Sequence, residues 1–327
     1  MDLNMNFNLS EMEEDHKAKP LSPDTIYDVL ILGGGPAGMT AAVYCMRKGV
    51  KTGLLTDNVG GQVSETSTVE NYMGYRYIEG SDLVKKFQDQ VKQFEIGYRE
   101  NSPATNIEQG DIKKVITENG TTYQARSLIV ATGKSPRWLD VPGEKKFMGK
   151  GVAVCAICDA PLYRDKDVVV VGGGNSGVEA TIDLAKIANH ITMVQFLDEL
   201  TADQVLIDKM NQFDNFDILY KHEVTEVLGD DKLEGVIVQN RDTMEEKRID
   251  AGGVFVEIGW VPNSEFIKDT LKLNKWDEVM IDCACRTSEK GIYAAGDVTS
   301  VPYKQIISAA GDGAKAALSA CEYVLKQ

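Results

Sequence analysis

The sequence of 327 residues lacks the features that mark membrane, secreted and nucleic-acid-binding proteins. No apolar run reaches the roughly 18 residues that a membrane-spanning helix needs, and the N-terminal residues do not resemble a secretory signal. Six cysteines are too few and too irregularly spaced for a disulfide framework. Basic residues are outnumbered 35 to 50, and the formal charge of −15 repels nucleic acid and anionic lipid. We therefore expect a cytoplasmic protein in a reducing compartment, with no nucleic-acid or membrane partner.

Histidine is scarce as well. His16, His190 and His222 show no mutual spacing that suggests a catalytic triad or a metal site. We therefore expect acid–base chemistry to come from carboxylates, thiols or a cofactor rather than from imidazole.

Two segments of the chain repeat one pattern, an apolar strand followed by a glycine-rich turn, a helix and a second strand. In the first copy these elements are expected at residues 27–32, 33–38, 39–48 and 51–56. In the second copy they are expected at residues 167–171, 172–177, 178–188 and 191–196. Such strand–turn–helix units are typical of dinucleotide-binding domains, so the sequence predicts two of them.

Later segments complete both domains. Strands are expected at 127–133, 253–259 and 291–297, and a helix at 306–325. The simplest assembly is an α/β protein with two Rossmann-like domains of the three-layer ββα type, the second inserted into the first. The predicted parts are a flexible N-terminal arm at 1–25, a first domain made of 26–147 and 261–327, and an inserted domain at 148–260.

Each glycine hexad, GGGPAG at 33–38 and GGGNSG at 172–177, has the residue types that a pyrophosphate requires. The first glycine allows a tight turn, the second a close approach of backbone to phosphate, and the third close packing of helix on strand. A single hexad can also be a packing feature. Because both copies follow apolar strands and precede helices, we expect at least one nucleotide site.

The chemical centre predicted from the sequence is Cys155-Ala156-Ile157-Cys158-Asp159. Two thiols at this spacing can close a disulfide, and the adjacent carboxyl can carry the proton of thiol–disulfide exchange. A purely structural pair is one alternative. Another is a zinc site completed by Cys283 and Cys285, but a C-x-C pair in a strand would point both side chains the same way, so we expect no metal. Cys45 and Cys321 lie in apolar helical stretches and are expected in the core.

The order of these motifs resembles that of the low-molecular-weight thioredoxin reductases, from about Tyr27 to the C-terminus. The resemblance is carried by both hexads, the CxxCD motif, Gly60-Gly61-Gln62, Ala131-Thr132-Gly133 and Ala295-Gly296-Asp297. Within that family the chain is most similar to the reductase portion of the alkyl hydroperoxide reductase flavoprotein subunit, through residues 69–72, 202–206 and 299–307. That flavoprotein carries a thioredoxin-like module ahead of its reductase portion, where this chain has about 25 polar residues. We therefore expect a separate thioredoxin-like or glutaredoxin-like protein as the redox partner, and a homodimer by resemblance only.

The resemblance implies roles for individual residues. The disulfide relay would use Cys158 facing the flavin, Cys155 as the interchange thiol and Asp159 as the proton donor. The residues expected to contact FAD are Gly33, Gly35, Pro36, Ala37, Gly38, Gly61, Gln62, Asn71, Thr132, Gly133, Gly296, Asp297, Lys304, Gln305 and Ile306. Those expected to contact NADH are Gly172, Gly174, Asn175, Ser176, Gly177 and Gln195. In relatives the inserted domain rotates to bring either the CxxC pair or the nicotinamide to the flavin.

The electron donor is where the chain departs from its relatives. NADPH-specific relatives carry His-Arg-Arg after the second strand of the inserted domain, whereas residues 194–200 here contain no base. A 2′-phosphate would meet the carboxylates of Asp198, Glu199 and Asp203 unpaired, so the sequence favours NADH, with Gln195 on the ribose. NADPH and ferredoxin remain alternative donors within the family. A redox-sensing flavoprotein that only binds a partner is the alternative of another class.

Overall fold

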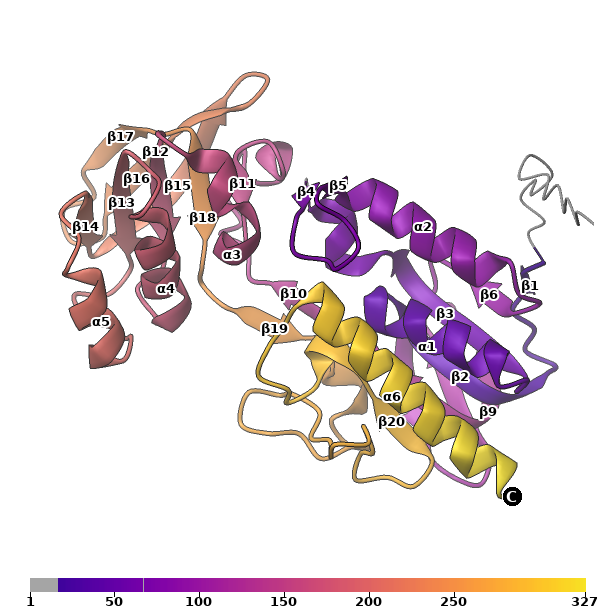
Figure 1. The fold of residues 1–327 in the computed structure, drawn as a ribbon. Coiled ribbons are helices and arrows are strands. Elements are labelled where there is room, and N and C mark those ends of the chain that lie inside the picture. Colours follow the sequence, from indigo (N-terminus) through magenta and orange to yellow (C-terminus); the bar gives the residue numbers. More distant parts are fainter. Residues whose placement is uncertain (1–16, 67) are drawn as a thin grey trace, which may run out of the picture. The chain divides into compact units, whose positions relative to one another are not determined.

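The computed structural model describes residues 17–66 and 68–327 (Figure 1). The chain forms two compact units. The first unit contains the described residues up to Ser64, together with Gly80–Lys134 and Pro262–Gln327. The second unit contains Glu65–Glu79 and Ser135–Val261. Residues 65–79, which the sequence analysis assigned to the first domain, thus group with the second unit.

The first unit is built on a sheet of eight strands. Its order is β1 (Lys19–Pro20), β6 (Gly97–Arg99), β3 (Thr52–Val59), β2 (Ile26–Gly34), β9 (Thr122–Val130), β8 (Lys113–Thr117) and β7 (Ala104–Glu108), with β20 (Ile292–Ala294) also paired to β9. Pairs from β1 to β9 are parallel, as is β20 with β9, whereas β7 and β8 run antiparallel. The helices are α1 (Pro36–Arg47), α2 (Gly80–Lys92) and α6 (Ile306–Leu325).

The side chains of β2 point alternately to the two faces of the sheet, and both faces are covered by apolar clusters. Val29 and Ile31 belong to a buried cluster with residues of α1 and α6, whereas Leu30 and Leu32 belong to a second cluster on the opposite face. Side chains of a strand point alternately to its two faces, so a continuous apolar run is what a strand buried on both sides requires. Because both faces of β2 are packed in the core, the position of the glycine turn that follows the strand is fixed.

The second unit repeats this plan with a parallel sheet of five strands. The order is β11 (Val152–Ala153), β18 (Gly253–Val256), β12 (Asp167–Val171), β13 (His190–Gln195) and β14 (Phe216–Tyr220). An antiparallel sheet follows, made of β15 (His222–Gly229), β16 (Leu233–Asn240) and β17 (Glu246–Asp250). The helices are α3 (Ala156–Asp159), α4 (Asn175–Leu184) and α5 (Gln204–Met210). Two small ladders pair β4 (Thr68–Val69) with β5 (Ile78–Glu79), and β10 (Lys134–Pro136) with β19 (Trp260–Pro262).

The predicted α/β class and the strand–turn–helix units are confirmed. Helix α6 spans the predicted 306–325, and α1 begins at Pro36, before the predicted 39, because proline fits the first turn of a helix. The predicted flexible arm is wrong from Lys19 onward. There Lys19 and Pro20 pair in parallel with β6, and Leu21 is buried in the core, which anchors this segment. Residues 1–16 of that arm lie outside the described residues.

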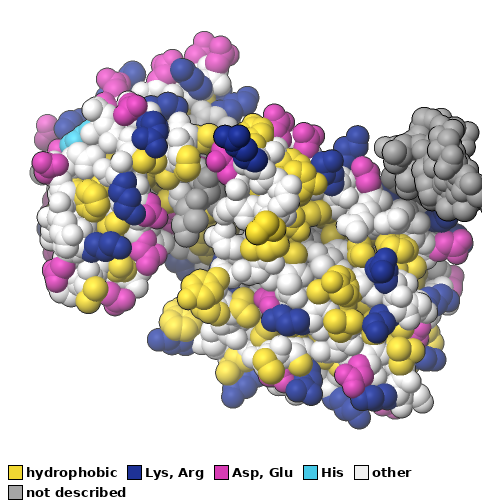
Figure 2. Space-filling model, in the orientation of Figure 1, with side chains coloured by type: hydrophobic (Ala, Val, Ile, Leu, Met, Phe, Trp, Pro, Cys, Tyr) yellow, Lys and Arg dark blue, Asp and Glu magenta, His cyan; other side chains and the backbone are white. Residues whose placement is uncertain are grey.

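The surface agrees with the composition. In the part of the chain that the structure describes, no helix combines the length and the apolarity needed to cross a bilayer. On the face drawn in Figure 2, basic and acidic side chains are interspersed, so the acidic excess does not gather into one patch there.

Candidate active site

The two glycine-rich turns have the same backbone. Gly33 and Gly172 each adopt a φ of 116°. A Cβ atom on Gly33 would lie 2.2 Å from the carbonyl oxygen of Ala131, and one on Gly172 would lie 2.4 Å from that of Glu257. Both the positive φ and the close approach exclude larger residues at these positions.

Each turn also has one glycine that is packed and one that faces open space. A Cβ on Gly38 or Gly177 would meet the carbonyl oxygen of the first glycine of its turn at 1.8 or 1.9 Å. A Cβ on Gly35, in contrast, would meet nothing within 4 Å, and one on Gly174 would meet only Thr201 Oγ1 at 3.7 Å. Both positions precede the first residue of a helix of ten or more residues, α1 and α4. This open space beside helix N–H groups fits a pyrophosphate, so both turns fit a dinucleotide.

In the first unit, the structure brings several of the residues predicted to bind FAD around this turn. Gly61 begins a 3-10 helix, Gly61–Glu65, which includes Gln62, and a Cβ on Gly61 would lie 3.6 Å from the Cα of Gly35. Ala37, on the first turn of α1, lies under two other glycines. A Cβ on Gly296 would lie 3.0 Å from the Cβ of Ala37, and one on Gly313 would lie 2.1 Å from its carbonyl oxygen. Gly313 was not singled out from the sequence.

Thr132 and Gly133 follow the C-terminal end of β9. The hydroxyl of Thr132 donates to the carbonyl of Asn263 at 2.7 Å, and the side-chain amide of Asn263 donates to the carbonyl of Thr132 at 2.8 Å. Gly133 has a φ of 70° and accepts the backbone N–H of Asn263 at 3.0 Å. The predicted Ala-Thr-Gly segment is thus held at the carboxyl edge of the sheet.

The predicted residues Asp297 and Lys304 lie in one charged cluster with Lys134 and Glu278. Glu278 accepts from Lys134 at 2.6 Å and pairs with Lys304 at 3.2 Å, and its side chain is 12% exposed. Burial raises the pKa of Asp297 against the opposing pull of both lysines. Burial also lowers the pKa of Lys304. No motif in the sequence points to Glu278, whose two lysine partners come from other segments of the chain.

Two further predictions concern the ends of this site. Gln305 precedes the first residue of α6, Ile306, so both lie at the N-terminus of that helix. Asn71 belongs to the second unit, so its proposed contact with FAD stays a prediction.

The redox motif lies between β11 and the start of α4 in the second unit. Cys155 is disulfide-bonded and is the residue that precedes helix α3. Its carbonyl accepts the backbone N–H of Asp159 at 3.0 Å, which closes the turn that contains both cysteines. The side chain of Cys158 lies outside those that the structure describes, so its pairing with Cys155 stays a prediction.

Asp159 has the properties of a proton carrier. Its Oδ1 atom is buried and has no hydrogen-bond partner among the described residues, and burial raises the pKa of this carboxyl to about 6. The nearby Tyr163 is also buried, which, together with the charge of Asp159, raises the pKa of its phenol to about 12. Asp159 can therefore hold or release a proton close to neutral pH, whereas Tyr163 stays protonated.

A second buried carboxyl, missed in the sequence, stands against the same motif. Glu257 is 8% exposed, and its Oε1 accepts the backbone N–H of Ala156 at 3.3 Å. Its carbonyl accepts the hydroxyl of Ser176, from the second glycine turn, at 3.3 Å. Burial raises the pKa of Glu257 to about 7. The sequence signal that could have revealed Glu257 is an acidic residue directly after an apolar strand, in GVFVE.

Gln195 is fixed by backbone groups around the second turn. Its Oε1 accepts the N–H groups of Gly173 at 3.0 Å and Phe196 at 3.1 Å, and its Nε2 donates to the carbonyl of Glu199 at 2.7 Å. Its side chain therefore holds the turn and the following loop, in addition to any contact with a ribose.

One of the three acids expected near a 2′-phosphate, Asp203, is hydrogen-bonded to the second glycine turn. Asn175 donates through its amide to Asp203 at 3.0 Å, and its Oδ1 accepts the backbone N–H of Asp203 at 2.8 Å. This partner is 28 residues earlier in the chain, in the glycine turn, and it adds no positive charge.

Residues 194–200 contain no basic residue, as the sequence analysis states. In the folded chain, however, two basic residues from other segments lie next to this loop. The guanidinium of Arg241, from the turn between β16 and β17, lies 3.5 Å from the ring centre of Phe196 and donates to its carbonyl at 3.3 Å. Lys221 donates its backbone N–H to Leu197 and pairs with Asp242 at 2.7 Å. Both bases therefore have partners within the protein.

The remaining cysteines are reduced. Cys45 and Cys321 are buried with their sulfur atoms 3.8 Å apart, which confirms their place in the core. Cys283 is exposed and Cys285 buried, so the expectation that both point the same way is wrong. These two residues lie in a turn, where Cys285 has a φ of 60°, rather than in a strand.

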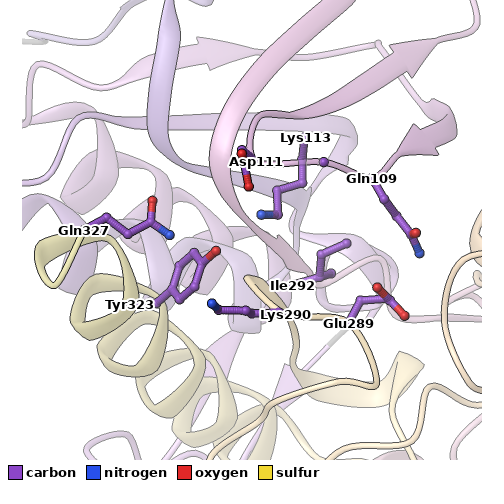
Figure 3. A pocket seen from close by; sticks show the side chains of 9 residues that line it. Gln109, Asp111, Lys113, Glu289, Lys290, Ile292, Tyr323 and Gln327 are labelled. Atoms are coloured by element: carbon purple, nitrogen blue, oxygen red, sulfur yellow. The ribbon is translucent and has the colours of Figure 1, made fainter.

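A cavity of about 340 Å³ in the first unit contains none of the predicted site residues. In Figure 3, Lys113 and Lys290 reach from separate segments toward Tyr323 of α6. Their ammonium groups lie 5.4 and 5.9 Å from the centre of its ring. We assign no role to this cavity.

Comparisons with known proteins agree with this site. Residues 27–313 match the family model described as pyridine nucleotide-disulphide oxidoreductase. The chain is 43% identical to the F subunit of the alkyl hydroperoxide reductase of Staphylococcus aureus, over 97% of this chain and 63% of that protein. It is 42% identical to a protein named NADH dehydrogenase of Ferdinandcohnia aciditolerans, over 97% of this chain and 61% of that protein. The chain thus spans about three fifths of the length of these relatives.

Among solved structures, the thioredoxin reductase of Streptococcus pyogenes is similar with a TM-score of 0.87 and 37% identity, covering 92% of this chain and 99% of that one. The thioredoxin reductase of Giardia duodenalis is similar with a TM-score of 0.84 and 32% identity, at the same coverage. The predicted fold, the resemblance and the membership of an oxidoreductase family are thereby confirmed. The chain belongs to the pyridine nucleotide-disulphide oxidoreductase family.

Proposed function

We propose that this protein passes electrons from NADH, through FAD, to a Cys155–Cys158 disulfide and from there to a disulfide of a separate thioredoxin-like or glutaredoxin-like protein. The observation that carries the proposal is the disulfide-bonded Cys155 at the start of α3, next to the buried carboxyl of Asp159. A glycine turn that fits a dinucleotide lies in the same unit. In this proposal the enzyme is cytoplasmic and a homodimer.

The chemistry balances as NADH, one proton and a disulfide giving NAD⁺ and two thiols. FAD, held at the first turn, would accept the hydride and supply the electron pair. The side chains of the protein provide the disulfide that accepts the electrons and the group that transfers a proton. Cys158 receives the electrons, Asp159 supplies a proton to a sulfur that leaves as thiolate, and Cys155 attacks the partner disulfide.

The preference for NADH rests on the charges around the second turn. A 2′-phosphate near Gln195 would lie among the carboxylates of Asp198 and Glu199, where an unpaired dianion is costly. Arg241 could oppose them, but its guanidinium is stacked on Phe196 and bound to the carbonyl of that residue. NADH needs no such partner. The relative named NADH dehydrogenase is consistent with this donor.

The test uses the FAD-loaded protein and two matched variants, Cys155→Ser and Cys158→Ser. We expect both variants to bind FAD and to be reduced by NADH without oxygen, yet to lose turnover of a small thioredoxin-like disulfide protein. Cys158→Ser should trap that protein as a mixed disulfide on Cys155, detectable by mass. Near-normal turnover in either variant would refute the relay.

The wild type distinguishes the donors. Flavin bleaching by NADH supports the proposal, and faster turnover with NADPH would refute the donor assignment. No bleaching by either nucleotide would point to ferredoxin. Bleaching without turnover of any protein disulfide would point to a redox sensor.

A further inference from the structure

Glu257 joins the nucleotide turn to the redox helix. It directly follows strand β18, and its carboxylate accepts the N–H of Ala156, the residue that follows Cys155. Its carbonyl lies against the second glycine turn, where Gly172 approaches closely and the hydroxyl of Ser176 donates.

Reduction of a disulfide by two electrons creates a need for two protons, one on each sulfur. One is the hydrogen that leaves NADH with the electron pair, and the other comes from water. Asp159 can deliver one proton to the pair, as proposed above. A second titratable group beside the motif can set how readily the other thiol ionises.

We propose that Glu257 is a positioning residue that controls the protonation of the Cys155–Cys158 dithiol, acting on the sulfurs through the N–H of Ala156 and through its own charge. When ionised, Glu257 accepts a hydrogen bond from this N–H, and its negative charge disfavours a thiolate on Cys155 or Cys158. As a neutral acid it removes the opposing charge. The inference rests on the proposed function, because it concerns the same cysteine pair.

The surroundings of Glu257 suit this role. Burial raises the pKa of its carboxyl to about 7, the hydrogen bonds from Ala156 and Ser176 oppose that rise, and the charge of Glu179 on α4 adds to it. Asp159 and Tyr163 are buried titratable groups near the motif, and the ammonium of Lys166 lies 5.1 Å from the ring centre of Tyr163. Since the neighbouring charge that acts on Glu257, that of Glu179, is also negative, a thiolate and a charged Glu257 disfavour one another, and the ionisation of one discourages that of the other.

The test is the pH dependence of thiol reactivity in the FAD-loaded protein, reduced with dithiothreitol and treated with iodoacetamide between pH 5 and 9. Alkylation of Cys155 is followed by mass. Glu257→Gln retains an oxygen that can accept from Ala156 but cannot ionise. We expect its Cys155 to be alkylated about three- to tenfold faster at pH 7, since ~1.4 kcal/mol corresponds to a factor of ten. The inflection near pH 7 in the wild type should disappear.

Two further variants keep the result interpretable. Glu179→Gln removes an exposed acid of α4 whose charge adds to the raised pKa of Glu257, so its inflection should remain and lie at a slightly lower pH. Glu257→Asp restores an ionisable group, and the inflection should return. The inference is overturned if Glu257→Gln binds FAD and shows the wild-type profile, or if Glu257→Asp behaves as Glu257→Gln does.

Failure of the proposed function is seen separately. If NADH, added without oxygen in place of dithiothreitol, exposes no alkylatable Cys155 in the wild type, then the cysteine relay is wrong. The pH profiles obtained with dithiothreitol would still report on Glu257.

Discussion

The turns at 33–38 and 172–177 share a backbone but differ in everything around them. In the first, the middle glycine Gly34 faces Thr56, and a 20-residue helix packs over the start of α1. In the second, Gly173 faces the amide of Gln195, and the loop that follows carries Phe196, whose side chain is 48% exposed. One turn is thus enclosed by packing and charge pairs, whereas the other has an open rim.

This difference shows what a glycine motif determines and what it does not. The hexad determines that phosphate can approach the backbone, because that depends on local geometry alone. Which nucleotide binds, and how long it stays, depends instead on the side chains around the turn, many of which come from other segments of the chain. The enclosed turn suits a resident cofactor, and the open one suits a substrate that must leave after each cycle.

The strongest way to break the comparison is a bulky residue at the open glycine of each turn. Gly35→Leu should leave almost no bound FAD, because its side chain would fill the space for pyrophosphate. Gly174→Leu should bind FAD normally but lose flavin reduction by NADH by about a hundredfold or more. FAD per chain, from visible absorbance, and stopped-flow reduction check both. Normal FAD content in Gly35→Leu, or a colourless Gly174→Leu, would show that the turns are assigned wrongly.

The next prediction is that replacing Asp159 with a neutral residue lowers turnover but raises stability. Asp159→Asn should slow disulfide reduction about a hundredfold, the usual contribution of a general acid, while leaving flavin reduction by NADH intact. Because burial raises the pKa of Asp159 from 3.8 to about 6, the folded chain holds a proton that the unfolded chain releases between these values. Stability therefore falls as pH rises through this window, and remains lowered above pH 6.

Asp159→Asn should remove that loss and stabilise the protein at pH 8 by about 1 to 3 kcal/mol, since each pKa unit is about 1.4 kcal/mol. At pH 4, where the carboxyl is mostly protonated in the folded state and about half protonated in the unfolded state, the gain should nearly vanish. Thermal unfolding at the two pH values measures it. An equal gain at both would mean that burial of charge is not the cause.

A smaller effect is expected from a change at the open rim. Phe196→Arg with Leu197→Arg should shift the preference from NADH toward NADPH by about tenfold or more in kcat/KM, because a guanidinium then pairs with the 2′-phosphate. Arg241→Ala is the matched control. We expect it to leave the wild-type preference for NADH unchanged, because Arg241 is engaged with Phe196. A wild type that prefers NADPH, and loses that preference in Arg241→Ala, would overturn the donor argument.

The smallest effect is expected at Gln195. Gln195→Glu keeps acceptors for Gly173 and Phe196, and adds charge to a ribose hydrogen bond that gains about 1 kcal/mol or less. NADH use should improve by about two- to fivefold, as a lower KM. The donated bond to the carbonyl of Glu199 is lost, so unfolding should be followed alongside. A rise in KM with unchanged stability would show that Gln195 does not face the ribose.

The sequence predicted the parts of this molecule that depend on neighbours in the chain. The alternation along β2, proline at the start of α1 and the two hexads are local signals, and the structure matches them. Cys155 and Asp159 were found in the same way. The long helix at 306–325 was also foreseen from its own residues.

The features that the sequence did not predict are contacts between segments that are far apart in the chain. Glu278 joins Lys134 and Lys304, and Arg241 reaches Phe196 across 45 residues of sequence. Glu257 touches Ala156 across 101 residues. No pattern in a single segment encodes such contacts, because they depend on the register and order of the sheets. The anchored segment at Lys19 and Pro20 escaped for the same reason.

The most direct test of the electron path is an anaerobic titration of the FAD-loaded protein with NADH, followed by flavin absorbance. If the Cys155 disulfide takes electrons from the flavin, the wild type should consume about two equivalents of NADH per FAD before bleaching is complete, because it holds two two-electron acceptors. Cys155→Ser and Cys158→Ser should each consume about one. Bleaching of the wild type by about one equivalent, with no difference from the variants, would contradict the account.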